Sequence, residues 1–288
     1  MIGYFSHFCE EHDIKLENVN RKVVDAYLDH LNASRHSKKG GPLSSHTVFL
    51  HVTRIKIFLN YCAQDEDFEK YVKTTTVRKI SKPKREELTL DTFTKEQVHA
   101  LISACEKVDV GSEKLNSYLI NRDRAMIYLL LDTGIRAAEL CGLTMRHLIL
   151  SPNDPHIRVF GKGDKWREIG LGKKCREELE RFVNQYRANE KGTDAFVFLT
   201  RKGGPMNVRT LQNTTERIGR LAHIENVRCS PHTYRHSYAV TFMRQTGNIY
   251  KLSKLMGHSS VKITENYLKS FTQQDARRGA ISPVDEVF

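Results

Sequence analysis

Long apolar runs are absent from this sequence. No stretch approaches the ~18–20 consecutive apolar residues that a membrane-spanning helix needs, and the first twenty residues lack the apolar core of a signal peptide. Glycine and proline are also scarce, at 17 and 7 of 288 residues, whereas 39% of the residues are hydrophobic. This composition excludes a collagen-like or disordered chain. We therefore expect a folded, soluble protein that works inside the cell.

Paired cysteines are absent as well. The six cysteines are scattered, with no C-x-x-C pair and no Cys/His cluster at zinc-ligand spacing. A zinc site and a disulfide scaffold are therefore excluded as the basis of the fold. We expect most of the six to be small core residues in a reducing compartment. They are Cys9, Cys62, Cys105, Cys141, Cys175 and Cys229.

Acidic residues are too few to balance the basic ones. There are 34 Asp and Glu against 46 Lys and Arg, which gives a formal net charge of +12. A basic balance of this size favours an anionic partner, and nucleic acid is the first candidate. The length of 288 residues predicts two domains, because a domain typically has ~100–200 residues.

The first 80 residues show helical periodicity. Apolar residues from Val19 to Leu31 recur at helical spacing, a polar loop follows to about Leu43, and a second apolar face begins after Ser45. We predict an N-terminal all-α bundle over residues 1–80. The second helix also has a side that we expect to be basic, with His46, His51, Arg54 and Lys56.

A strongly basic segment follows this bundle. Residues 70–85 contain seven basic residues and no acidic one, with Pro83 and little apolar periodicity. We interpret the segment as an interdomain linker, and we set the linker boundaries at 81–93. It is either a solvated spacer or a strap across a phosphate backbone, because clustered charge increases the counterion release that drives binding to nucleic acid.

The second domain, residues 94–271, is predicted to be mainly α with a small antiparallel β-sheet (α+β). The sequence T-K-E-Q at 94–97 has the pattern of a helix-capping box. Alternating residues at 156–160 and 166–171, separated by G-K-G-D-K, predict a β-hairpin. We expect one more strand at 195–199 and helices at about 122–132, 136–143, 174–188, 207–222, 231–246, 248–256 and 260–270.

Four motifs in this domain combine side chains suited to phosphodiester transfer without a metal. They are residues 133–140 (T-G-I-R-A-A-E-L), 161–165 (G-K-G-D-K), 232–236 (H-T-Y-R-H), and G-H at 257–258 followed by Tyr267. Arginine forks can hold the charge on the nonbridging oxygens of the transition state. A tyrosine can form a covalent intermediate if cations help to ionise its phenol, and a lysine on a hairpin tip can protonate the leaving oxygen.

The set Arg136, Lys162, His232, Arg235, His258 and Tyr267 resembles the active site of the tyrosine recombinases, or integrase family, most of all the Xer-type and mobile-element members. The resemblance covers residues 94–271, and the first domain is similar to the family's helical core-binding domain in pattern only. It implies that Tyr267 attacks the scissile phosphate, that Arg136 and Arg235 hold the nonbridging oxygens, and that Lys162 protonates the leaving 5′-oxygen. His232 would assist proton transfer from the tyrosine, His258 would bind the phosphate, and Glu139 would orient the site.

Several of these side chains have competing interpretations. Lys165 lies on the same hairpin as Lys162 and could be the general acid instead. Tyr267 could be a buried structural tyrosine, and three other tyrosines could in principle be nucleophiles, although we attribute them to core packing. These three are Tyr234, Tyr238 and Tyr250. We interpret His236 as a packing or surface residue.

The resemblance also implies a partner and an assembly. The partner would be double-stranded DNA, held in a C-shaped clamp of two domains, and no cofactor or metal is implied. The assembly would be a homo-tetramer on two DNA sites that exchanges the C-terminal tail, residues 272–288, in the cytoplasm at the nucleoid. Integration, excision and resolution would use the same chemistry. The DNA-binding candidates are Lys38, Lys39, Arg54, Lys56, Arg78, Lys79, Lys82, Lys84 and Arg85.

Two other functions remain open at this point. A type IB topoisomerase shares the phosphotyrosine chemistry and relaxes supercoils as a monomer. A DNA-binding regulator could keep the fold without strand exchange.

Overall fold

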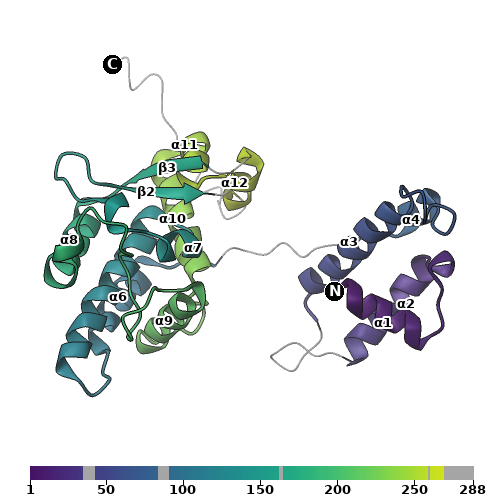
Figure 1. Cartoon of the computed structure of the whole chain (residues 1–288), viewed down its shortest axis with the longest axis horizontal. Helices are drawn as coiled ribbons and strands as arrows, with labels where there is room; N and C mark the ends of the chain where they lie inside the picture. The colour runs from purple at the N-terminus through teal and green to yellow at the C-terminus, as the bar shows by residue number, and fades with distance from the viewer. Residues whose placement is uncertain (35–42, 84–90, 162–164, 259, 269–288) are drawn as a thin grey trace, which may run out of the picture. The chain divides into compact units, whose positions relative to one another are not determined.

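The computed structural model describes residues 1–34, 43–83, 91–161, 165–258 and 260–268. The chain divides into two compact units, Met1–Leu88 and Thr89–Phe288 (Figure 1). The boundary between them lies within the stretch 81–93. Each unit has its own hydrophobic core.

Unit 1 is entirely helical in its described residues. Its apolar faces, predicted from the helical spacing, meet in one core that includes Tyr27, Leu31, Ile55 and Leu59. The elements are α1 (Ile2–Glu11), η1 (Leu16–Asn18), α2 (Arg21–Ser34), α3 (Ser45–Cys62) and α4 (Thr74–Lys79).

One expectation for α3 is wrong. His51, which the sequence placed on a basic side of this helix, is buried, and its Nδ1 lies 2.8 Å from the hydroxyl of Tyr27. A buried tyrosine hydroxyl needs a hydrogen-bond partner, and this histidine supplies it from the neighbouring helix. His51 therefore belongs to the core of unit 1.

The basic segment 70–85 is not a simple linker. Its middle forms α4, and the apolar residues Val72, Val77 and Ile80 are buried in the core of unit 1. Three apolar residues among seven cations are too few to show a period in the sequence, yet they suffice to anchor one short helix. Arg78 and Lys79 point away from this core and are exposed.

Unit 2 is mainly helical, as predicted. Its helices are α5 (Lys95–Ala104), α6 (Glu113–Thr133), α7 (Ala137–Cys141), α8 (Lys173–Tyr186), α9 (Val208–Leu221), α10 (Pro231–Thr246), α11 (Ile249–Met256) and α12 (Val261–Leu268), with 3-10 turns η2 (Cys105–Lys107), η3 (Met145–His147) and η4 (Ala188–Glu190). The capping box at Thr94 is present, with Gln97 as its second member. Helix α6 begins at Glu113 rather than near Arg122, and the hydroxyls of Ser117 and Tyr186, 2.6 Å apart, connect its early turns to α8.

The sheet has three antiparallel strands in the order β1-β2-β3. The predicted hairpin is β2 (His156–Gly161) and β3 (Lys165–Gly170), with Ile157 opposite Ile169. β1 (Leu148–Ile149) is too short for any sequence pattern to reveal. The strand expected at 195–199 is absent from this described stretch, which makes only isolated bridges; Val197 and Phe198 are apolar because they are buried in the core.

The core of unit 2 lies between the sheet and helices α5, α6, α8 and α9. Five of the six cysteines are buried and all six are free thiols, which confirms their expected role as small core residues. None of the described helices is long and apolar enough to cross a membrane.

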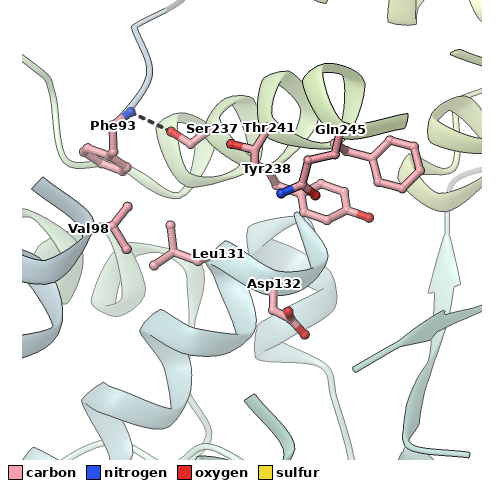
Figure 2. A pocket seen from close by; sticks show the side chains of 9 residues that line it. Phe93, Val98, Leu131, Asp132, Ser237, Tyr238, Thr241 and Gln245 are labelled. Carbon is pink, nitrogen blue, oxygen red and sulfur yellow. Dashed lines mark hydrogen bonds between the residues drawn. The ribbon is translucent and has the colours of Figure 1, made fainter. Parts of the chain in front are cut away.

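Where the described part of unit 2 begins, the chain is fixed to α10. The backbone N–H of Phe93 donates to Ser237 Oγ at 2.8 Å, and both residues line a pocket with Leu131, Asp132 and Tyr238 (Figure 2). The same helix α10 carries His232 and Arg235. The start of unit 2 therefore helps to hold the helix that bears two of the candidate site residues.

Candidate active site

The turn between α6 and α7 sets the position of Arg136. Gly134 ends α6 with φ +57°, and a Cβ at this position would overlap the ring of Tyr238. Two residues later, Arg136 is the N-cap of α7: its backbone N–H donates to Glu139 Oε2 and its Nη1 donates to Oε1, both at 2.9 Å. The sequence R-A-A-E therefore builds its own support for this arginine.

Arg235 approaches the same turn from α10. Ser230 caps this helix and Pro231 starts it, which places Arg235 in its second turn. The guanidinium is buried, with Nη1 donating to the carbonyl of Gly134 and Nη2 to that of Met256, both at 2.6 Å. Burial and the nearby Arg136 lower the pKa of Arg235 to about 10, so it still carries its charge at neutral pH.

His258 lies against Arg235. Its Nε2 accepts a hydrogen bond from Arg235 Nη2 at 3.2 Å, so the proton of the neutral ring is on Nδ1, which lies 2.8 Å from Thr264 Oγ1. Burial and the charges of Arg235, Arg136 and Arg167 lower the pKa of His258 to about 4. The imidazole is therefore neutral at neutral pH.

Tyr267, on α12, completes this group. Its ring stacks on that of His258 with centroids 6.0 Å apart, and the ring of His236 meets it edge-on at 5.5 Å. The residue is 7% exposed and packs with Leu252 and Met256 of α11. Burial raises the pKa of Tyr267, while the charge and hydrogen bond of Arg235 act in the opposite direction.

Arg167 on β3 was missed by the sequence analysis. Its Nη1 and Nη2 donate to the two oxygens of Glu139, each at 2.8 Å. The signal for it lies in the strand alternation: Arg167 is two residues before Ile169, which faces the core. A charged residue on the inner face of a strand requires a partner, and Glu139 is that partner.

The other candidates in this domain are placed differently. His232 is exposed, one turn before Arg235. Burial lowers the pKa of His236, and the neighbouring His232 and Arg235 lower it further. Lys162 lies outside the described residues, and Lys165 is exposed at the start of β3. Tyr234 is fully buried, as core packing requires, but Tyr250 is 71% exposed and is not a core residue.

The DNA-binding candidates of unit 1 fall into three groups. Arg54, Arg78, Lys79 and Lys82 are exposed. Lys56 is half-buried and donates to the carbonyl of Ile80, just after α4, so it also has a structural role. The remaining four lie outside the described residues: Lys38, Lys39, Lys84 and Arg85.

The described side chains offer no metal site. Within the described ranges, no three His, Cys, Asp or Glu side chains gather in a way that could hold a metal ion. What they do assemble is two arginines, a neutral histidine and a tyrosine around one turn, with a carboxylate behind Arg136. This arrangement can bind an anion and place a phenol beside it.

Comparison with known proteins identifies the family of this chain. The model of the phage integrase family matches residues 91–274, and that of the phage integrase SAM-like domain matches residues 1–76. The chain belongs to the phage integrase family. Tyrosine recombinase XerD of Staphylococcus aureus is 27% identical over 266 residues, covering 92% of this chain and 83% of the relative. Tyrosine recombinase XerC of Staphylococcus epidermidis is 25% identical over 272 residues, covering 94% and 84%.

Solved structures share the fold. The XerH site-specific recombinase bound to a palindromic difH substrate in a post-cleavage complex aligns with TM-score 0.77 and 19% identity, over 96% of this chain and 76% of that one. A lambda integrase dimer bound to a core site aligns with TM-score 0.66 and 16% identity, over 94% and 89%. The two-domain recombinase fold predicted from the sequence is confirmed.

Proposed function

We propose that this protein is a site-specific DNA recombinase that cuts and rejoins DNA strands through a covalent 3′-phosphotyrosyl intermediate on Tyr267. The observation that carries this conclusion is the convergence of Arg136, Arg235, His258 and Tyr267 around one turn in a member of the phage integrase family. The reaction class is DNA strand cleavage and religation.

In the proposed step, the phenolic oxygen of Tyr267 attacks the scissile phosphorus. The Oη–P bond forms as the bond from phosphorus to the 5′-oxygen breaks, so the number of phosphate ester bonds is conserved and religation needs no external energy source. The proton of the phenol leaves with the help of His232, and the departing 5′-oxygen takes a proton from Lys162. In the free protein the proton of His258 is on Nδ1, so the imidazole must change tautomer, with its proton on Nε2, to donate a hydrogen bond to the phosphate.

The two arginines neutralise the phosphate in the transition state. Arg136 is the more accessible, with 31% of its side chain exposed, whereas Arg235 is buried behind it. In the free protein their Nη2 atoms donate to the carbonyls of Gly257 and Met256. A dianionic transition state is a stronger acceptor than a peptide carbonyl, and donors that are already ordered cost little reorganisation.

The environment of Tyr267 supports activation by DNA. Burial raises the pKa of its phenol, so the free protein holds this side chain protonated. Two guanidinium groups beside it favour the phenolate once a base has removed the proton. We infer that cleavage depends on correct placement of the phosphate, which limits attack of the phenol on unrelated phosphate esters.

The proposed partner is double-stranded DNA, which we propose that both units bind. The exposed Arg54, Arg78, Lys79 and Lys82 of unit 1 support phosphate contacts, because basic side chains on such a surface release counterions on binding. The proposed assembly is a homo-tetramer on two DNA sites with exchange of the tail 272–288. The proposed place of action is the cytoplasm, at the nucleoid.

Two alternatives are less well supported. A type IB topoisomerase would use the same intermediate, but the XerD and XerC relatives are named tyrosine recombinases. A regulator that only binds DNA would have no need for a tyrosine held between His258 and His236 beside Arg235.

The experiment that tests the proposal is trapping of the covalent complex. Wild type, Tyr267→Phe and Tyr250→Phe are incubated with DNA from the flanks of the gene, nicked near candidate sites, and separated by denaturing electrophoresis. We expect an adduct that survives detergent for wild type and for Tyr250→Phe, which changes an exposed tyrosine. Tyr267→Phe should bind the DNA but form no adduct. An adduct that persists in Tyr267→Phe would refute the assignment.

A further inference from the structure

Three arginines converge on the C-terminus of α11. The carbonyls of Leu255, Met256 and Gly257 accept from Arg167 Nε at 2.9 Å, from Arg235 Nη2 at 2.6 Å and from Arg136 Nη2 at 2.8 Å. The last carbonyls of a helix have no partner within the helix, and they carry its negative dipole end. Side chains from β3, α10 and the start of α7 therefore meet at one helix end.

Arg167 differs from the other two in how it uses its remaining N–H groups. Both of its Nη atoms donate to Glu139, whose oxygens also accept the backbone N–H and the Nη1 of Arg136. Side-chain exposure is 12% for Arg167 and 5% for Glu139. Burial would raise the pKa of Glu139, but the hydrogen bonds from Arg167 and Arg136 lower it to about 2, so the shared carboxylate stays charged.

Two glycines, which have no side chain, leave the space that the guanidinium of Arg167 occupies. A Cβ on Gly161 would lie 3.0 Å from its Nη1, and a Cβ on Gly257 would lie 3.0 to 3.2 Å from its Nη1, Cζ and Cδ. Gly257 also has φ +62°, which an L side chain rarely adopts. The group is therefore enclosed by backbone on two sides, and its position is narrowly fixed.

We propose that Arg167 is a positioning residue for DNA cleavage, which fixes Glu139 and the end of α11 so that Arg136 is aimed at the scissile phosphate. This inference rests on the proposed function. Arg167 need not touch the DNA, because it acts through the carboxylate that it shares with Arg136. It also joins the hairpin strand β3 to the turn that carries His258.

Lysine cannot take over this role. Arg167 makes three hydrogen bonds in one plane, two to a carboxylate and one to a carbonyl, and a lysine ammonium lacks this flat fork. If charge alone mattered, Arg167→Lys would keep the activity. If the planar geometry matters, Arg167→Lys should slow DNA cleavage almost as much as Arg167→Gln.

The first measurement is the single-turnover rate of adduct formation together with the DNA dissociation constant. Arg167→Gln and Arg167→Lys should form the adduct about 10- to 100-fold more slowly, since a displacement near 1 Å can cost that much. Their Kd should stay within about threefold of wild type, because phosphate contacts elsewhere dominate the affinity. Arg176→Gln is the matched control: Arg176 is 17% exposed and paired with Glu180, in α8, and its loss should leave the rate unchanged.

The second measurement needs no DNA. The Nε–Hε resonance of Arg136, assigned by its loss in Arg136→Lys, is recorded by NMR in the free protein. It should shift or broaden in Arg167→Gln and stay in place in Arg176→Gln. If wild type formed no adduct, the proposed function would fail, and this resonance would still test the coupling. An unmoved Arg136 resonance, or an unchanged cleavage rate in a folded Arg167→Gln protein, would overturn the inference.

Discussion

At the scale of single residues, the side chains of this site hold one another through direct hydrogen bonds. Glu139 binds two arginines, and Arg235 is buried against two carbonyls and a histidine. The motif residues could be chosen from the sequence because their chemistry is distinctive. The strand alternation marks Arg167 as an inward-facing charge, but its partner is a carboxylate 28 positions away in the chain, and only folding brings the two together.

The buried carboxylate of Glu139 makes the free energy of unfolding depend on pH in the acidic range. The ordinary pKa of 4.5 for Glu139 falls to about 2 in the folded protein, so its contribution is complete above pH 4.5 and is lost as the pH falls towards 2. We expect Glu139→Gln to lower the free energy of unfolding at neutral pH, and the deficit to shrink between pH 4.5 and 2. Urea unfolding of both proteins across this range measures it. A deficit of constant size would contradict the assignment, and Glu180→Gln, a half-exposed control, should cost little.

The glycine that ends α6 is a second residue-scale test. Gly134 combines φ +57° with a Cβ position only 2.4 Å from Cδ1 of the Tyr238 ring, whereas Gly192 has φ +74° with nothing within 4 Å. Gly192→Ala should therefore show backbone strain alone, about 1 kcal/mol. Gly134→Ala adds a steric clash and should unfold at clearly lower temperature in a thermal melt. Equal melting temperatures for the two variants would show that Tyr238 yields freely.

At the scale of elements, periodicity predicted the long helices and the hairpin because each has a clear apolar face. Periodicity gave wrong predictions where apolar residues are buried without forming a regular helix or strand, and where a strand is too short to show a period. Residues 195–199 are apolar and buried without forming a strand, and β1 is two residues long. Helix α4 is not evident from the sequence, because basic residues outnumber buried apolar residues in the segment 70–85. The pattern of this segment therefore resembles that of a linker.

Helix α4 should therefore separate stability from DNA affinity. Val77 is 1% exposed, so Val77→Ala should cost about 1–3 kcal/mol of stability in unit 1 and leave the salt dependence of DNA binding unchanged. The double variant Arg78→Gln, Lys79→Gln should do the reverse. It should reduce the slope of log K against log salt by about 0.9 for each phosphate that the removed cations neutralise, at unchanged stability. The Val77 variant and the double variant serve as controls for each other. If either one changed both the stability and the salt dependence of DNA binding, the proposed separation of these two roles in α4 would be refuted.

At the scale of the whole molecule, the described residues of the proposed chemistry are confined to one of the two units. Every described side chain that we place at the reacting phosphate lies in unit 2, between Arg136 and Tyr267, and unit 1 has a core of its own. Recombination requires more than cleavage, because strands must pass between two DNA sites. The tail 272–288, which lies outside the described residues, ends in apolar side chains that include Ile281, Val284 and Phe288.

Deleting residues 272–288 should therefore abolish recombination of a two-site plasmid while DNA binding and adduct formation on a single site largely persist. The physical reason is that cleavage depends on contacts within unit 2, such as those from Arg235 to Met256 and His258, whereas exchange of strands between sites depends on contacts between protomers. A full-length tail in which serine replaces the apolar residues distinguishes the effect of apolar docking from the effect of tail length. If the deletion variant recombines at the wild-type rate, the tail is not the protomer contact, and the proposed tetramer would have to be held by surfaces of the units themselves.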